Sequence, residues 1–291
     1  MPVMRFSINI PNFGDFADAR TVARVAAAAE QEGWDALFLW DHVVHDKEIR
    51  RDQPFGDPWI LLTAAALATS TLKIGTLVTA VPRRRPEHLA RQVATLDALS
   101  GGRVIFGAGL GGPIDDEFGS FGQPTDPVVL AEHLDESLGL LDRYWSGNPV
   151  DHDGKHYQVR DVTLRPATVQ QPRPPVWLAA VWPNRKPVRR AARWDGVAPL
   201  FKNATHGVAP APEDVRDVVS YARKHGAGEN FEFVVGGRTP GDPARARDVL
   251  APLAEAGATW WDERQLITTS DLDRLEPTLR RISQGPPRGV D

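Results

Sequence analysis

The stretch that decides the fold runs from residue 73 to residue 112 and has the sequence KIGTLVTAVPRRRPEHLARQVATLDALSGGRVIFGAGLGG. It starts and ends with apolar, β-rich runs that predict two strands, at 73–78 and from Val104 onward. Between them, Pro86 can occupy the first turn of a helix. Proline has no backbone N–H, and an N–H in the first turn would have no acceptor within the helix. Apolar residues then recur on one face of the helix, at Leu89, Val93, Leu96 and Leu99. Two strands joined by an amphipathic helix indicate parallel neighbours in a sheet that is covered on both faces.

Small residues mark the carboxyl ends of both predicted strands. The first strand contains Gly75 and Thr76, and the second ends in Gly107, Ala108 and Gly109. Glycine at this end lets a ligand approach the backbone closely, and parallel α/β folds place their ligand sites there. We therefore expect the functional site at this end of the sheet.

The same strand and helix unit recurs along the whole chain. Further strands are predicted at residues 5–10, 36–39, 176–179, 196–200, 231–235 and 259–261. Further helices are predicted from about residue 18, at 57–68, along the stripe from Leu130 to Trp145, around 186–193, within 212–225, at 243–256 and around 271–282. With the central unit this gives eight strands and eight helices in alternation, which predicts an α/β fold of the (β/α)8 TIM-barrel type. We expect a single domain over residues 1–283 and a disordered tail at 284–291.

Two segments are too long for ordinary connections between a strand and a helix. Residues 113–127 are a candidate lid, in which Asp115, Asp116 and Glu117 are expected on a solvated face. Residues 146–175 contain four prolines and the motifs HYQV and VTLRP, which favour a small hairpin at the far end of the barrel.

The composition excludes several classes of function. The chain has 291 residues with 42% hydrophobic and 25% charged side chains, as in a globular protein with a large core. Its net charge of −4 predicts no general attraction to nucleic acid or to an anionic membrane. It contains no cysteine, so disulfides and thiolate chemistry are excluded. No apolar run approaches the ~18 residues of a membrane span, and a cytoplasmic enzyme is the expectation.

Several segments resemble the bacterial luciferase-like flavin-dependent oxidoreductases, a (β/α)8 family with members that use the deazaflavin coenzyme F420. They are GWDALFLWDHV at 33–43, the whole stretch at 73–112, and PVWLAA through ARWDGVAP at 175–199. The resemblance implies an oxidoreductase or monooxygenase that binds FMN or F420, undecided between the two, at the carboxyl-terminal mouth of the barrel. It also implies a small organic substrate and a possible homodimer, since relatives are commonly dimers.

Asp41 and His42 follow the second predicted strand. A neutral imidazole near pH 7 can accept or donate a proton, and a neighbouring carboxylate can fix its tautomer. Adjacent residues on a strand point in opposite directions, so a direct pair between these two is not assured, and a structural capping pair is the alternative. The resemblance implies that His42 handles the proton during hydride transfer, with Asp41 as its companion in the catalytic group.

The next two strand ends are predicted to touch the cofactor. The resemblance implies a backbone bulge over Thr76, Leu77 and Val78, often with a non-prolyl cis peptide, against the central ring of the cofactor. The edge of the ring would then lie against Gly107 and Gly109. A plain buried strand is the alternative for the first segment. Relatives that oxidise a sugar phosphate have a glutamate where this chain has Leu110, which argues against that activity.

A further cofactor contact is predicted at Ala179, Ala180, Trp182, Asn184 and Arg185. Many relatives have Ala-Ala-Gly-Gly-Pro here, whereas this chain replaces the glycines by Val-Trp, so Trp182 is expected to wall the pocket. Asn184 and Arg185 open the following helix and suit a phosphate group. A rival phosphate site is the Gly-Gly-Arg-Thr segment at 236–239, because barrels often bind phosphate after the seventh strand.

Two further expectations concern the mouth of the barrel. Arg83, Arg84 and Arg85 are expected in a solvated loop, with attraction of an anionic cofactor tail as the alternative. An apolar rim is expected from Trp40, Phe106, Trp182 and Phe201.

Two other functions remain open on the sequence. One is a cofactor-binding barrel without turnover. The other is a metal-dependent barrel hydrolase, which has little support because the chain has no HExxH motif and no HxH pair at a strand end. No metal site is predicted.

Overall fold

The computed structural model describes residues 4–287 and contains a closed barrel of parallel strands. Around the ring the order is β1-β10-β9-β8-β7-β4-β3-β2, so the first strand pairs with both the second and the last. The barrel strands are β1 Arg5–Ile10, β2 Ala36–Leu39, β3 Lys73–Ala80, β4 Val104–Gly109, β7 Val176–Trp182, β8 Gly196–Phe201, β9 Glu232–Gly237 and β10 Trp260–Arg264. The predicted (β/α)8 barrel is confirmed.

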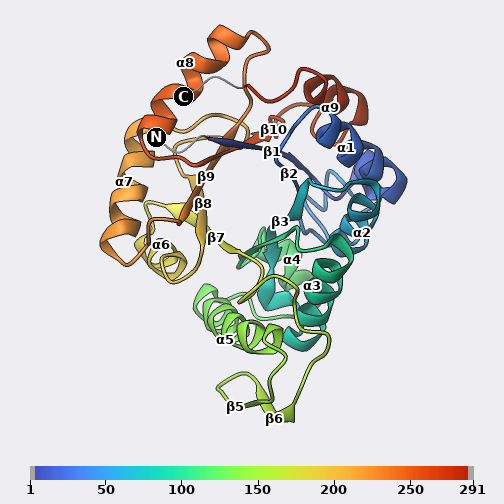
Figure 1. Cartoon of the computed structure of the whole chain (residues 1–291), viewed down its shortest axis with the longest axis vertical. Helices are drawn as coiled ribbons and strands as arrows, with labels where there is room; N and C mark the ends of the chain where they lie inside the picture. The colour runs from blue at the N-terminus through green and yellow to red at the C-terminus, as the bar shows by residue number, and fades with distance from the viewer. Residues whose placement is uncertain (1–3, 288–291) are drawn as a thin grey trace.

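Apart from the short α4, the helices lie outside the ring of strands (Figure 1). They are α1 Ala19–Gln31, α2 Pro58–Ala68, α3 Pro86–Ser100, α4 Ile114–Glu117, α5 Pro127–Trp145, α6 Arg185–Ala191, α7 Pro212–Lys224, α8 Pro243–Glu255 and α9 Leu275–Ile282. Local signals set their ends. Asp57 caps α2 by accepting hydrogen bonds from two backbone N–H groups, and α3 ends at Gly101, whose φ of 66° favours glycine. The last helix starts later than the predicted 271, because residues 270–273 form turns.

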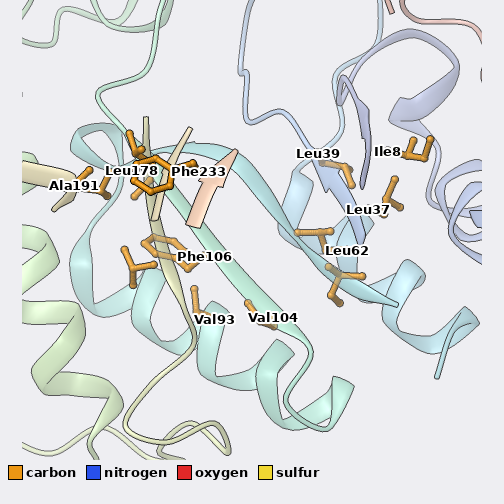
Figure 2. Close-up of a cluster of buried hydrophobic side chains, with 14 of the residues drawn as sticks. Ile8, Leu37, Leu39, Leu62, Val93, Val104, Phe106, Leu178, Ala191 and Phe233 are labelled. Carbon is orange, nitrogen blue, oxygen red and sulfur yellow. The ribbon is translucent and has the colours of Figure 1, made fainter. Parts of the chain in front are cut away.

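Alternate residues of each strand face outward and pack against these helices. Figure 2 shows part of this outer core, in which Leu37 and Val104 from the strands lie near Leu62 and Val93 from the helices. All four side chains are fully buried. Burial of one such side chain contributes about 1.5–3 kcal/mol, so this layer is the main source of stability.

The remaining residues of the strands face the interior of the barrel. Phe38 of β2, Trp177 of β7 and Trp260 of β10 meet there, with ring centroids 5.2 to 6.4 Å apart. Strands β2 and β7 are not neighbours in the ring, so these side chains meet through its centre. A cavity of about 670 Å³ lies on the amino-terminal side of Trp177 and Trp260. It lies among the first residues of the strands, at the end of a barrel where catalytic sites are not found.

Both long insertions contain regular structure. The predicted hairpin is confirmed as the antiparallel pair β5 Val150–Asp153 and β6 Gln158–Val162, which lies outside α5 (Figure 1). The segment 113–127 contains α4 and a short 3-10 helix, Gly119–Phe121. The predicted tail begins with a turn at 284, and residues 288–291 lie outside the described part of the chain. Within residues 4–287, no helix combines the length and apolarity that crossing a membrane requires.

Candidate active site

His42 lies at the carboxyl end of β2, beside the indole of Trp40, with the two ring centroids 5.5 Å apart. Its Nδ1 lies 2.9 Å from Oε1 of Glu117, and its side chain is 16% exposed. No hydrogen bond joins Nε2 to any residue among 4–287. A carboxylate acceptor at Nδ1 favours the Nδ1–H tautomer of a neutral imidazole, in which Nε2 is the proton acceptor.

Glu117 corrects one prediction from the sequence. It was expected on a solvated face, but its side chain is fully buried. Besides His42, it accepts a hydrogen bond from the backbone N–H of Val43, and its Oε2 lies 3.1 Å from Nε of Arg83. A buried carboxylate is tolerated when such partners replace its water. Glu117 therefore ties the segment after β4 to the segment after β2.

Asp41 does not pair with His42, although it is adjacent in sequence. Its carboxylate accepts hydrogen bonds from Arg83 and Arg84, at 3.0 and 2.7 Å, and from the backbone N–H of Ala80. Burial alone would raise the pKa of Asp41, but Arg84 and then Arg83 more than offset this, so its pKa lies below the usual value. Its contacts position the loops that carry the site.

The three arginines do not form the solvated loop that the sequence predicted. The side chains of Arg83 and Arg84 are only 9% and 14% exposed. Arg85 alone lies at the surface, where it pairs with Glu87. The first two are held by Asp41, because buried guanidinium groups require a compensating charge.

The predicted bulge in β3 is confirmed. The peptide bond between Leu77 and Val78 is cis, and the pairing of β3 with β4 shifts in register between Thr76 and Thr79. The hydroxyl groups of the two threonines lie 2.6 Å apart. Leu77 and Val78 stay partly exposed, and Leu77 packs against the interior cluster.

Gly107 and Gly109 face this bulge. A Cβ on Gly107 would lie 2.0 Å from the carbonyl oxygen of Thr76, and one on Gly109 would lie 2.8 Å from Cγ2 of Val78. The glycines are thus required by the close approach of β3 to β4. Whether a cofactor edge also lies against them stays a prediction.

The predicted contacts on β7 divide between its two faces. Ala179 is on the interior side, next to the position that a Cβ on Gly109 would occupy. Ala180 and Trp182 belong to the outer core, where Trp182 packs against Tyr221 of α7. The guanidinium of Arg185 lies over the Trp182 ring, at 4.8 Å from its centroid. Asn184 is exposed just before α6 and makes no side-chain capping bond.

The apolar rim also differs from expectation, whereas the rival phosphate segment stays a prediction. Phe106, Trp182 and Phe201 belong to the outer core, so an apolar rim built from them is wrong, and only Trp40 lies beside His42. In the 236–239 segment, Thr239 is buried and bonded to Glu263.

Several polar residues near the mouth were missed by the sequence analysis. His45 and His206 approach His42 and Trp40, with centroid distances of 4.6 and 4.9 Å respectively. Burial, with a smaller contribution from Arg264, lowers the pKa of His206 to about 3, so it is neutral. Arg264 was missed as well, although the charged sequence Asp-Glu-Arg at 262–264, directly after an apolar strand, is a signal that could have indicated it.

Comparison with known proteins identifies the family. The family model described as "Luciferase-like monooxygenase" matches residues 4–266. The chain belongs to this family. The curated relatives of the family include F420-dependent glucose-6-phosphate dehydrogenase of Beutenbergia cavernae, 33% identical over 147 residues, which are 50% of this chain and 43% of the relative. The uncharacterised protein y4vJ of Sinorhizobium fredii is 28% identical over 58% of this chain and 45% of its own length. The chain therefore spans less than half the length of the curated relatives it matches.

Solved structures share the same barrel. The monooxygenase RslO1 from Streptomyces bottropensis has a TM-score of 0.77 at 20% identity, covering 97% of both chains. The coenzyme F420 dependent tetrahydromethanopterin reductase from Methanopyrus kandleri has a TM-score of 0.74 at 18% identity, covering 98% of both chains. The oxygenating constituent of 3,6-diketocamphane monooxygenase from Pseudomonas putida, in complex with FMN, has a TM-score of 0.74 at 16% identity, covering 98% of this chain and 97% of that one. At these sequence identities, the structural similarity shows that the chain shares the fold of these proteins.

Among residues 4–287, no group of three or more His, Cys, Asp or Glu side chains is placed to hold a metal ion.

Proposed function

We propose that this protein is an oxidoreductase that binds FMN or F420 at the carboxyl end of the barrel and acts on a small organic substrate. The observation that carries the proposal is the state of His42. Its Nδ1 is held by a buried carboxylate, while its Nε2 is free beside the mouth of the barrel. A histidine fixed in one tautomer with an open nitrogen is suited to move one proton during a redox step.

Small residues line the end of the barrel where the proposal places a flat redox ring. Its inward positions at the carboxyl ends of the strands are small, at Gly107, Gly109, Ala179, Ala198 and Gly236. The bulge at Leu77 and Val78 presents a broad face of backbone and apolar side chain beside them. The cofactor, when bound, supplies hydride transfer or, for FMN, the activation of oxygen.

The residues of the chain have separate tasks in this proposal. His42 gives or takes the proton at Nε2, and Glu117 orients its ring. Asp41 acts through Arg83 and Arg84 to hold the loops in place. The interior aromatic cluster of Phe38, Trp177 and Trp260 excludes water from the amino-terminal side.

The position of the cofactor phosphate is part of the proposal, and two segments compete for it. Arg185 and Arg238 are both exposed, one as the first residue of α6 and the other directly after β9. The variants Arg185→Gln and Arg238→Gln separate them, because only one should lower cofactor affinity.

A homodimer also belongs to this proposal. Ile60 and Leu67 on α2 are 64% and 72% exposed, which gives this helix an apolar outer face. Sedimentation velocity on the purified protein tests it, and a monomer at micromolar concentration would contradict it.

The experiment that tests the function is a titration of the purified protein with FMN and with F420, followed by fluorescence. We expect micromolar affinity for one cofactor, and turnover of its reduced form with electron acceptors. His42→Ala should keep the affinity and lower the rate by roughly 10²–10⁴-fold. Binding with a rate that His42→Ala leaves unchanged would favour a binding protein without turnover, and no binding of either cofactor would reject the proposal.

A further inference from the structure

Arg264 is a buried guanidinium that points into the barrel at the end of its last strand. Along β10, Trp260 belongs to the interior cluster and Trp261 to the outer core, so alternation turns Asp262 and Arg264 inward. Asp262 confirms this, because it bonds to Ser7 and Asn9 on the inner face of β1. Arg264 is only 7% exposed.

Most of the donors of Arg264 have no partner. Its Nε lies 2.7 Å from Oδ2 of Asp262, but no residue among 4–287 accepts a hydrogen bond from Nη1 or Nη2. Neither nitrogen is fully enclosed by the protein, so both are accessible to solvent. Arg103 provides the contrast. It is equally buried, yet all three of its nitrogens donate to oxygens of the chain.

The surroundings favour an anion at these free donors. Burial raises the pKa of Asp262 in spite of its three donors. Its two oxygens are shared with Ser7 and Asn9, so that it satisfies only Nε of Arg264. His206, the other ionisable neighbour, is neutral. The position beside the guanidinium is a glycine, Gly236, where a Cβ would lie 2.6 Å from Nε. The backbone of β9 is therefore shaped to admit the arginine.

The position links this group to the candidate active site. Asn9, which bonds to Asp262, also accepts a hydrogen bond from the indole N–H of Trp40. Trp40 in turn contacts both His206 and His42. Arg264 and His42 are therefore connected through contacts of Asp262, Asn9 and Trp40.

We propose that Nη1 and Nη2 of Arg264 bind a carboxylate of the substrate, so that the protein acts on a small organic acid. Two parallel N–H donors match the two oxygens of a carboxylate. The inference rests on the proposed function, because it places the anion beside the group that handles the proton. It goes further, since it names the substrate class and a residue that selects it.

Direct binding of simple anions tests the inference without turnover. Acetate, malonate and inorganic phosphate are titrated into the full-length protein at constant ionic strength, with and without bound cofactor, by calorimetry. We expect a carboxylate to bind more tightly than phosphate. Arg264→Lys should weaken this binding by roughly 10- to 100-fold, because a point charge replaces the fork of donors, and Arg264→Gln should abolish it.

Matched variants control for loss of structure. Arg247→Gln removes an exposed guanidinium and should leave carboxylate affinity unchanged. Asp262→Asn keeps an oxygen for Nε but removes the counter-charge, so it should tighten carboxylate binding even if the Arg264 variants fold poorly. Carboxylate affinity that Arg264→Gln leaves intact, or a preference for phosphate, overturns the inference. Cofactor affinity, measured on the same samples, separates the two proposals: a protein that binds cofactor but no carboxylate retains the proposed function and loses this one.

Discussion

At the scale of single residues, Glu117 makes the contacts that hold His42 in place, although the sequence did not predict it as a site residue. It lies 75 positions from His42 in sequence, yet its carboxylate is 2.9 Å from the imidazole. The same carboxylate faces Arg83, so removal of its charge affects both the proton-handling group and a buried cation. Glu117 is a positioning residue for His42 and a structural partner for Arg83.

Glu117→Gln should therefore lower turnover and stability together. The amide keeps the shape of the side chain, but Arg83 loses its second ionic partner, and the tautomer of His42 is no longer fixed. Glu117→Ala should cost about 3–5 kcal/mol, as expected when one partner of a buried pair is removed. Urea unfolding measures the cost. Asp116→Asn is the matched control, because its partner Lys47 is half exposed, and it should cost less than about 1 kcal/mol.

Glu30 gives a prediction of pH dependence. Burial would raise its pKa, but backbone N–H groups of Thr71, Leu72 and Ser70 outweigh this and lower the pKa to about 2, from a reference of 4.5. Because the folded pKa is depressed, the stabilisation is complete above pH 4.5 and is lost as pH falls toward 2. After allowance for solvent screening, Glu30→Gln should cost roughly 1–2 kcal/mol at pH 7. The difference in unfolding free energy from the wild type should shrink steadily between pH 5 and pH 3, and a constant difference would contradict the assignment.

The sequence predicted the individual groups better than their partners. His42 and the bulge at Leu77 follow from local pattern and family resemblance. The partners of Asp41 and His42 do not, because Arg84 and Glu117 stand in polar segments whose composition alone indicates solvent. These charges meet only because the parallel pairing of β2, β3 and β4 brings the carboxyl ends of the three strands to one edge.

At the scale of elements, β10 shows why charged residues can extend a strand. The sequence predicted its end at Trp261, because Asp262, Glu263 and Arg264 are charged. In the structure the strand continues to Arg264 with all five residues buried. Each charge has a specific partner: Glu263, for example, accepts hydrogen bonds from Thr239 and from the Trp261 indole. Such compensation is a property of neighbouring strands and is absent from the local pattern.

The contact between β3 and β4 yields a prediction with a built-in control. Gly107→Ala would place a Cβ 2.0 Å from the Thr76 carbonyl, so the two strands must separate. We expect a loss of about 1–3 kcal/mol or more, together with weaker cofactor binding at the displaced bulge. Gly139→Ala in α5 meets no atom within 4 Å and should instead stabilise the protein by about 0.5–1 kcal/mol. Thermal unfolding compares them, and equal effects of the two substitutions would refute the steric argument.

At the scale of the whole molecule, closure of the barrel brings together segments that are far apart in the sequence. Strand β1 pairs with β10 over five positions, from Arg5 with Trp260 to Asn9 with Arg264. The interior cluster draws Phe38 from the first half of the chain and Trp177 and Trp260 from the second. Neither half therefore has a complete core of its own, and the eightfold alternation seen in the sequence has physical meaning only for the closed ring.

This shared core predicts that the two halves unfold together. Chains of this size often populate intermediates, but here the loss of either half exposes the same interior cluster. Tryptophan fluorescence and far-UV circular dichroism should thus give the same urea midpoint. Trp260→Ala should lower both midpoints equally, by an amount that corresponds to about 3–5 kcal/mol. Phe121→Ala, at a side chain that is 53% exposed, should move neither midpoint. If Trp260→Ala shifted one midpoint and left the other in place, the halves would be separate folding units, and the cluster would be a point of contact between them.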